Sequence, residues 1–138
     1  MFKVFWLLRR KPGLTHAQFR EHYENSHSRL GRDWFGHLMI GYHRNYIEAE
    51  MGSSVDADGT VSFGPVEPEW DCIAEWMMPD EAAFTEITRI LAQPEVHAIF
   101  AEDEKRFADR TAFRLVRVDV VDDGTGDGHL TTGVKATA

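Results

Sequence analysis

The sequence has little cysteine, few basic residues and no long apolar run. Its 138 residues include one cysteine, Cys72, so an intramolecular disulfide is excluded and a reducing compartment is expected. The apolar run Val4–Leu8 is too short for a membrane span or for the core of a signal peptide, which favours a cytoplasmic protein. With 15 Lys and Arg against 23 Asp and Glu, the formal charge of −8 argues against nucleic acid and anionic membranes as partners.

The sequence does contain the alternating strand and helix patterns of a single domain. A hydrophobic content of 43% over this length predicts one core. Apolar patterns predict strands at 4–8, 38–47, 71–78 and 113–120, and helices that begin at His16, near Asp80 and at Pro94. The order β-α-β-β-α-β, with the second helix in two parts, predicts an α+β, ferredoxin-like domain over residues 1–120 with a four-stranded antiparallel sheet. Residues 50–69 are expected to form an insertion with a turn at Asp58-Gly59, and residues 121–138 a flexible or partner-contacting tail.

The predicted strands are apolar on both faces. Phe5 and Leu7 alternate with the other apolar residues of the first strand, and Ile73 faces away from Cys72 on the third. Helices on one side of the sheet cover only one of these faces. We therefore expect a homodimer in which two sheets pack against each other.

The first helix carries polar residues at its inner end. Thr15 and Gln18 form a capping box at its start. The apolar stripe through Phe19 and Tyr23 then reaches Ser26 and His27, which predicts a cavity beneath the last turn. The alternative is a helix end at which a cationic His27 interacts with the macrodipole and Gly31 stops the helix.

Together with the predicted order of strands and helices, several segments of the sequence resemble the EthD family of dimeric α/β-barrel proteins. The similarity lies in K-V-F-W-L-L-R-R-K-P-G-L-T from Lys3 to Thr15, F-R-E-H-Y-x-x-x-H from Phe19 to His27, Asp71 and Glu75 of the third strand, and E-D-E-K-R-F-A-D from Glu102 to Asp109. Similar barrels include methylmuconolactone isomerases, polyketide cyclases and dehydratases, anthrone-type monooxygenases without a metal, and haem-binding relatives. The isomerases carry a Cys on the third strand where this chain has Trp76.

The resemblance implies a cleft between the helices and the sheet, with His27 and Tyr42 as catalytic residues. The residues expected to bind substrate are Trp6, Tyr23, Arg44, Tyr46 and Trp76. Such a cleft suits an aromatic, phenolic, polyketide-like or lactone substrate. His27 would be the general acid or base of a lyase, dehydratase or isomerase that needs no cofactor.

Several alternatives stay open at this point. Tyr42, Tyr46 and Trp76 can instead be core residues, and Arg44 can pair with Asp71 or Glu75 across strands. Glu75 and His43, on the face opposite Trp76, are expected in structural or dimer roles. Asp103, Glu104 and Asp109 are interpreted as capping and charge-pairing residues at a helix end. The seven histidines show no metal-binding spacing, so no metal is expected, and haem would need His27 or His97 as a ligand. A cofactor-free monooxygenase and a non-catalytic binding protein are the other functions considered.

Overall fold

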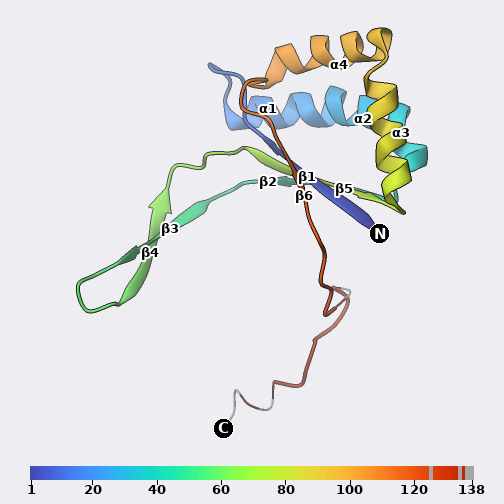
Figure 1. Ribbon diagram of the computed structural model, residues 1–138. Coiled ribbons are helices and arrows are strands. Elements are labelled where there is room, and N and C mark those ends of the chain that lie inside the picture. Colours follow the sequence, from blue (N-terminus) through green and yellow to red (C-terminus); the bar gives the residue numbers. More distant parts are fainter. Residues whose placement is uncertain (125, 134, 136–138) are drawn as a thin grey trace.

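The computed structural model describes residues 1–124, 126–133 and 135. It is an α+β domain in which helices lie on one side of a four-stranded antiparallel sheet (Figure 1). The strand order is β2-β5-β1-β6, and the strands are β1 (Phe2–Leu8), β2 (Gly41–Tyr46), β5 (Cys72–Met78) and β6 (Arg114–Arg117). This confirms the predicted fold class, although β2 and β6 are shorter than the expected 38–47 and 113–120. In the described part of the tail no helix or strand follows β6.

The two faces of the sheet have the composition that the alternation predicts. On the helix side, Val4 and Leu8 of β1 and Cys72 and Ala74 of β5 are buried. On the outer face, Lys3 binds Glu75 of the neighbouring strand at 2.8 Å, and His43 of β2 approaches the same carboxylate at 3.5 Å. Phe5, Leu7 and Ile73 are only partly buried on this face. No helix covers the outer face in Figure 1.

The first helix is longer than predicted. It begins as α1 (His16–His22) with the expected Thr15–Gln18 capping box, passes through a π-helical turn at Tyr23–His27, and continues as α2 (Ser28–Phe35). A short 3-10 turn, Gly36–Leu38, follows. The expected stop at Gly31 is therefore wrong, because the chain stays helical beyond it and buries Phe35 completely.

Two further helices, α3 (Glu81–Leu91) and α4 (Pro94–Phe107), complete the layer above the sheet (Figure 1). Asp80 caps α3, and Pro94 occupies the first turn of α4, as predicted. The core between helices and sheet contains Ile87, Phe100 and Phe107. Ile99 of α4 is 40% exposed and lies outside this core.

Residues 50–69 contain a hairpin, as suggested by the turn at Asp58-Gly59. It consists of β3 (Glu50–Val55) and β4 (Val61–Val66), which form a separate two-stranded sheet. Gly59 has φ +86°, a conformation that glycine adopts without strain. Figure 1 shows the hairpin projecting from the end of the main sheet, on the side away from the helices.

Within the described residues, no helix is both long and apolar enough to cross a membrane.

Candidate active site

A cavity of about 260 Å³ lies between the helices and the sheet. Five of the residues predicted from the sequence line it, namely Trp6, Tyr23, His27, Tyr42 and Trp76. The remaining walls are mostly apolar and come from Leu8, Gly31, Phe35, Leu91, Phe100 and Phe113, with His97 and Glu104 as the additional polar residues. Drug-sized ligands occupy pockets of about 300–1,000 Å³, so this cavity suits a smaller molecule.

His27 is held in the cavity wall by a buried carboxylate. Its Nδ1 lies 2.9 Å from Asp103 Oδ2 on α4, and its ring packs edge-on against Tyr23 and Phe100. In the described residues no hydrogen-bond partner is found for Nε2. A neutral imidazole beside a carboxylate donates from Nδ1, which leaves Nε2 as the basic nitrogen.

Asp103 contacts three polar side chains of the helix that carries His27. Besides His27, Ser26 Oγ donates to Oδ1 at 2.5 Å, and His22 Nε2 lies 3.0 Å from the same oxygen. The residue is only 6% exposed. Burial acts to raise the pKa of Asp103, but the hydrogen bonds from His27 and Ser26 outweigh it and lower the pKa to about 2. Asp103 is therefore a stable anion behind His27.

Two tyrosines form the polar part of the cavity wall. Tyr42 of β2 donates its hydroxyl to the Tyr23 hydroxyl at 2.9 Å. Burial raises the pKa of Tyr42 to about 12 and that of Tyr23 well above its usual value. Both phenols therefore remain protonated at neutral pH and act as hydrogen-bond donors. Since Tyr23 accepts from Tyr42, and no acceptor for the Tyr23 hydroxyl is found in the described chain, Tyr23 has a proton to offer a ligand.

The sheet side of the cavity is formed by two indoles. Trp6 and Trp76 pack with ring centroids 5.5 Å apart. Both Nε1 atoms are buried without a hydrogen-bond partner among the residues that the structure describes. An unpaired buried donor costs about 1–3 kcal/mol, so such groups are uncommon in cores. The two indoles, with their planes inclined by 58°, form the aromatic floor of the cavity.

Arg44 and Tyr46 do not line the cavity, although they share the helix-side face of β2 with Tyr42. Arg44 Nε and Nη2 each donate to Glu24 at 2.7 Å, and Tyr46 donates to the same carboxylate at 2.5 Å. The alternative partners Asp71 and Glu75 are also wrong for Arg44. Glu24 lies in the π-helical turn, and its side chain reaches β2. This cluster fixes the helix on β2.

Three polar residues at or behind the cavity, Asp103, Glu104 and His97, were not predicted as site residues. The sequence of α4 does indicate that Asp103 is buried. The residues of its buried face follow at intervals of four, three and four, and they are Val96, Phe100, Asp103 and Phe107. A carboxylate therefore occupies a core position. The neighbouring Glu104 lines the cavity, and burial raises its pKa. No group of three or more metal-ligating side chains is found in the part of the chain that the structure describes.

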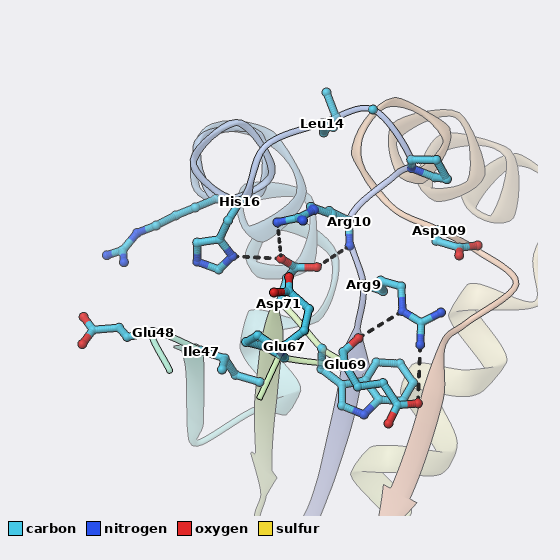
Figure 2. Close-up of a pocket in the computed structure, with 15 residues that line it drawn as sticks. Arg9, Arg10, Leu14, His16, Ile47, Glu48, Glu67, Glu69, Asp71 and Asp109 are labelled. Carbon is cyan, nitrogen blue, oxygen red and sulfur yellow. Dashed lines mark hydrogen bonds and ion pairs between the residues drawn. The ribbon is translucent and has the colours of Figure 1, made fainter. Parts of the chain in front are cut away.

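A wider groove of about 1,000 Å³ lies at the end of the sheet, where the hairpin joins it (Figure 2). Here Asp71 accepts the Arg10 backbone N–H at 2.8 Å and contacts His16 Nδ1 at 2.9 Å. Arg9 binds the Glu69 backbone oxygen at 3.0 Å. Figure 2 shows these charged groups directed at one another. These contacts anchor the loop between β1 and α1, and Arg9 and Arg10 directly follow the end of β1.

Comparisons with known proteins agree with this architecture. Among solved structures, an EthD family protein from Bacillus halodurans is 20% identical, with a TM-score of 0.55 over 88% of this chain and 100% of the other. A hypothetical protein from Arabidopsis thaliana is 16% identical, with a TM-score of 0.50 over 90% of this chain and 91% of the other. A search of curated proteins found no match. The model of the EthD domain family matches residues 11–111, and the chain therefore belongs to the EthD domain family.

Proposed function

We propose that this chain is an enzyme that acts on a small aromatic, phenolic, polyketide-like or lactone molecule through general acid and base catalysis by His27. The observation that carries the proposal is the 2.9 Å contact between His27 Nδ1 and the buried carboxylate of Asp103. His27 also lines the cavity. The carboxylate favours the tautomer with a basic Nε2 and stabilises the imidazolium formed when that nitrogen takes a proton. His22 contacts the same carboxylate, and His27 differs from it in that His27 also lines the cavity.

The reaction that these residues support begins beside a carbonyl group of the substrate. The C–H bond breaks, the proton moves to His27 Nε2, and the electron pair becomes an enolate. Tyr23 donates a hydrogen bond to the enolate oxygen, supported by the hydroxyl of Tyr42. Return of the proton to another carbon completes an isomerisation. In a dehydration a C–O bond breaks instead, and the hydroxide leaves as water with a proton from the imidazolium or from Glu104.

The apolar walls set the class of substrate. Trp6, Trp76 and Phe35 offer flat surfaces to a ring, and the polar groups are confined to His27, the tyrosines, His97 and Glu104. A reaction without a cofactor is part of the proposal. Addition of haem to the purified protein tests this part, because a Soret shift that is lost on replacing His27 or His97 would assign an iron ligand instead. A cytoplasmic location also belongs to the proposal and is supported by the free, buried Cys72.

A matched pair of histidine variants tests the catalytic role. A panel of small lactones, phenols and aromatic β-hydroxy ketones is incubated with the protein, and turnover is followed by mass spectrometry. We expect His27→Gln to lower turnover by about 10²–10⁴-fold while ligand affinity is retained. His22 contacts the same Asp103 but does not line the cavity, so His22→Gln is the control and should retain most activity. Equal losses in both variants would refute the assignment, and binding without turnover by the wild type would indicate a binding protein.

We also propose that the chain forms a homodimer through the outer face of its sheet. Phe5, Leu7 and Ile73 supply an apolar surface there, beside the ion pair of Lys3 and Glu75. A partner sheet would cover these residues as the helices cover the inner face. Sedimentation of the wild type and of a Leu7→Asp variant tests the dimer, and a monomeric wild type would refute it.

A further inference from the structure

The β3–β4 hairpin is separate from the main sheet. Among the described residues its two strands pair only with each other, and the hairpin projects away from the helix layer (Figure 1). Isolated two-stranded hairpins are at best marginally stable in water and need a third strand or a packed surface. A formed hairpin in this position therefore indicates that something packs against it.

The two faces of the hairpin differ in chemistry. On one face the cross-strand pairs are Met51 with Pro65, Ser53 with Phe63, and Val55 with Val61. On the other face Gly52 pairs with Gly64, and Ser54 pairs with Ser62 through hydroxyls 3.1 Å apart. Alternation of this kind is typical of a strand pair with one buried face. The sequence of the hairpin is thus suited to being covered on one side only.

The apolar face is open to solvent in the single chain. Phe63 is 68% exposed, Val55 67%, Met51 55% and Val61 53%. Soluble monomers rarely expose a contiguous apolar patch beyond a few hundred Å², and larger patches mark interaction sites. Four large apolar side chains on one narrow ribbon form such a site.

We propose that the hairpin is an arm that packs its apolar face on a second copy of this chain. The hairpin projects toward the same side as the uncovered outer face of the sheet, so one partner can cover both surfaces (Figure 1). A stable dimer buries about 1,200–2,000 Å², which an apolar patch on the order of a few hundred Å² does not reach alone. In a two-fold dimer each arm and each sheet face contributes twice to the buried surface.

The salt dependence of the dimer distinguishes an apolar contact from one held by ion pairs. A formal charge of −8 opposes the association of two copies, and the exposed apolar face of the hairpin offers the attraction that offsets it. We therefore expect added salt to tighten the dimer by screening that repulsion. A contact held by ion pairs would weaken under the same conditions. The arm is independent of the reaction proposed for His27, and turnover plays no part in its test.

Two valines of β4 provide a matched test. Val61 is 53% exposed on the apolar face, and Val66 is 44% exposed on the opposite face. Sedimentation velocity over a range of protein concentrations measures the dissociation constant of the dimer. We expect Val61→Asp to raise this constant by at least about tenfold, because it places a carboxylate in the buried contact, and Val66→Asp to change it by less than about twofold. Phe63→Ser should act like Val61→Asp.

Circular dichroism and thermal unfolding check that the variants fold, since the hairpin lies outside the core. A wild type that is monomeric at all concentrations would overturn the proposal. Equal effects of Val61→Asp and Val66→Asp would overturn it too. If the wild type is a dimer and every hairpin variant has the same dissociation constant, the dimer forms through the sheet face alone, and the proposed contact of the hairpin with the second copy is refuted.

Discussion

Replacing Asp103 with Asn tests whether a buried anion organises the site. The carboxylate binds Ser26, His22 and His27 and has its pKa lowered from 3.8 to about 2. This difference corresponds to about 2 kcal/mol by which the folded state prefers the ionised form. Since the carboxyl is almost fully buried, solvent screening reduces this value little. We expect Asp103→Asn to lower the free energy of unfolding by about 2 kcal/mol at neutral pH, with Asn keeping part of the hydrogen bonding.

The stabilisation by the ionised Asp103 should decrease as the pH falls. The folded-state pKa of Asp103 lies below its unfolded value, so the stabilisation is complete above about pH 5 and is lost as the pH falls toward about 2. The difference between wild type and Asp103→Asn should shrink over the same range. Taking the difference removes the contribution of the other carboxyl groups, which titrate in both proteins.

Urea unfolding from neutral to acidic pH, followed by circular dichroism, measures both effects. Glu102→Gln is the control, because Glu102 lies next to Asp103 on α4 but is exposed, and Lys105 at 3.1 Å is its one partner among the described residues. Its unfolding free energy should change by less than about 0.5 kcal/mol. A difference between wild type and Asp103→Asn that stays constant down to the acidic end would refute the charge-based reasoning, even if the variant were less stable.

Three further predictions concern the surroundings of the cavity. Hydrogen bonds from Arg44 lower the pKa of Glu24 to about 2, and the Glu24 side chain is 36% exposed. After solvent screening, Glu24→Gln should lower the free energy of urea unfolding by about 1 kcal/mol at neutral pH, and this difference should disappear as the pH falls toward that pKa. An unchanged unfolding free energy at neutral pH would contradict the prediction. A Cβ on Gly31 would lie 3.6 Å from the Tyr42 ring, so Gly31→Ala should stabilise by up to about 1 kcal/mol through helix propensity, whereas Gly31→Leu should abolish ligand binding in calorimetry. Burial raises the pKa of the Cys72 thiol to about 12, so iodoacetamide should label Cys72 only in unfolded protein, and rapid labelling of the native chain would refute its burial.

Local sequence patterns were sufficient where a few neighbouring residues determine the structure. The Thr15–Gln18 capping box and Pro94 at the start of α4 depend on contacts within one turn. Alternation grouped the residues that share a strand face, and the resemblance to the EthD family placed the face of Tyr42 and Trp76 toward the helices, where the structure has it. The family was also identified from such patterns.

Contacts between distant elements could not be predicted in this way. Nothing near Arg44 in the sequence indicates that it binds Glu24, because the choice among several acidic residues depends on how the helix is rotated on the sheet. The same holds for Asp103, whose core position was visible in the spacing of α4 but whose partners lie on another helix. The residues around the cavity were predicted more completely than the network behind them.

The π-helical turn shifts the buried face of the first helix. Continuing the stripe of Phe19 and Tyr23 at helical spacing leads to Leu30, which is partly buried against the core, whereas Ser28 and Phe35 are completely buried. Tyr23 and Ser28 are five residues apart, and the Ser28 N–H indeed donates to the Tyr23 carbonyl. One additional residue in this turn therefore rotates everything after it by about 100°.

This turn also has a consequence for catalysis. A π turn is less favourable than an α turn and persists where other contacts hold it, often at functional sites. Here Ser26 and His27 lie within the turn, and both bind Asp103, which is 76 residues away from His27 in the sequence. The orientation of the proposed base thus depends on α4 as much as on its own helix. A proton acceptor held in this way is positioned before the substrate arrives, and pre-organisation of this kind is what acid and base catalysis requires of a protein.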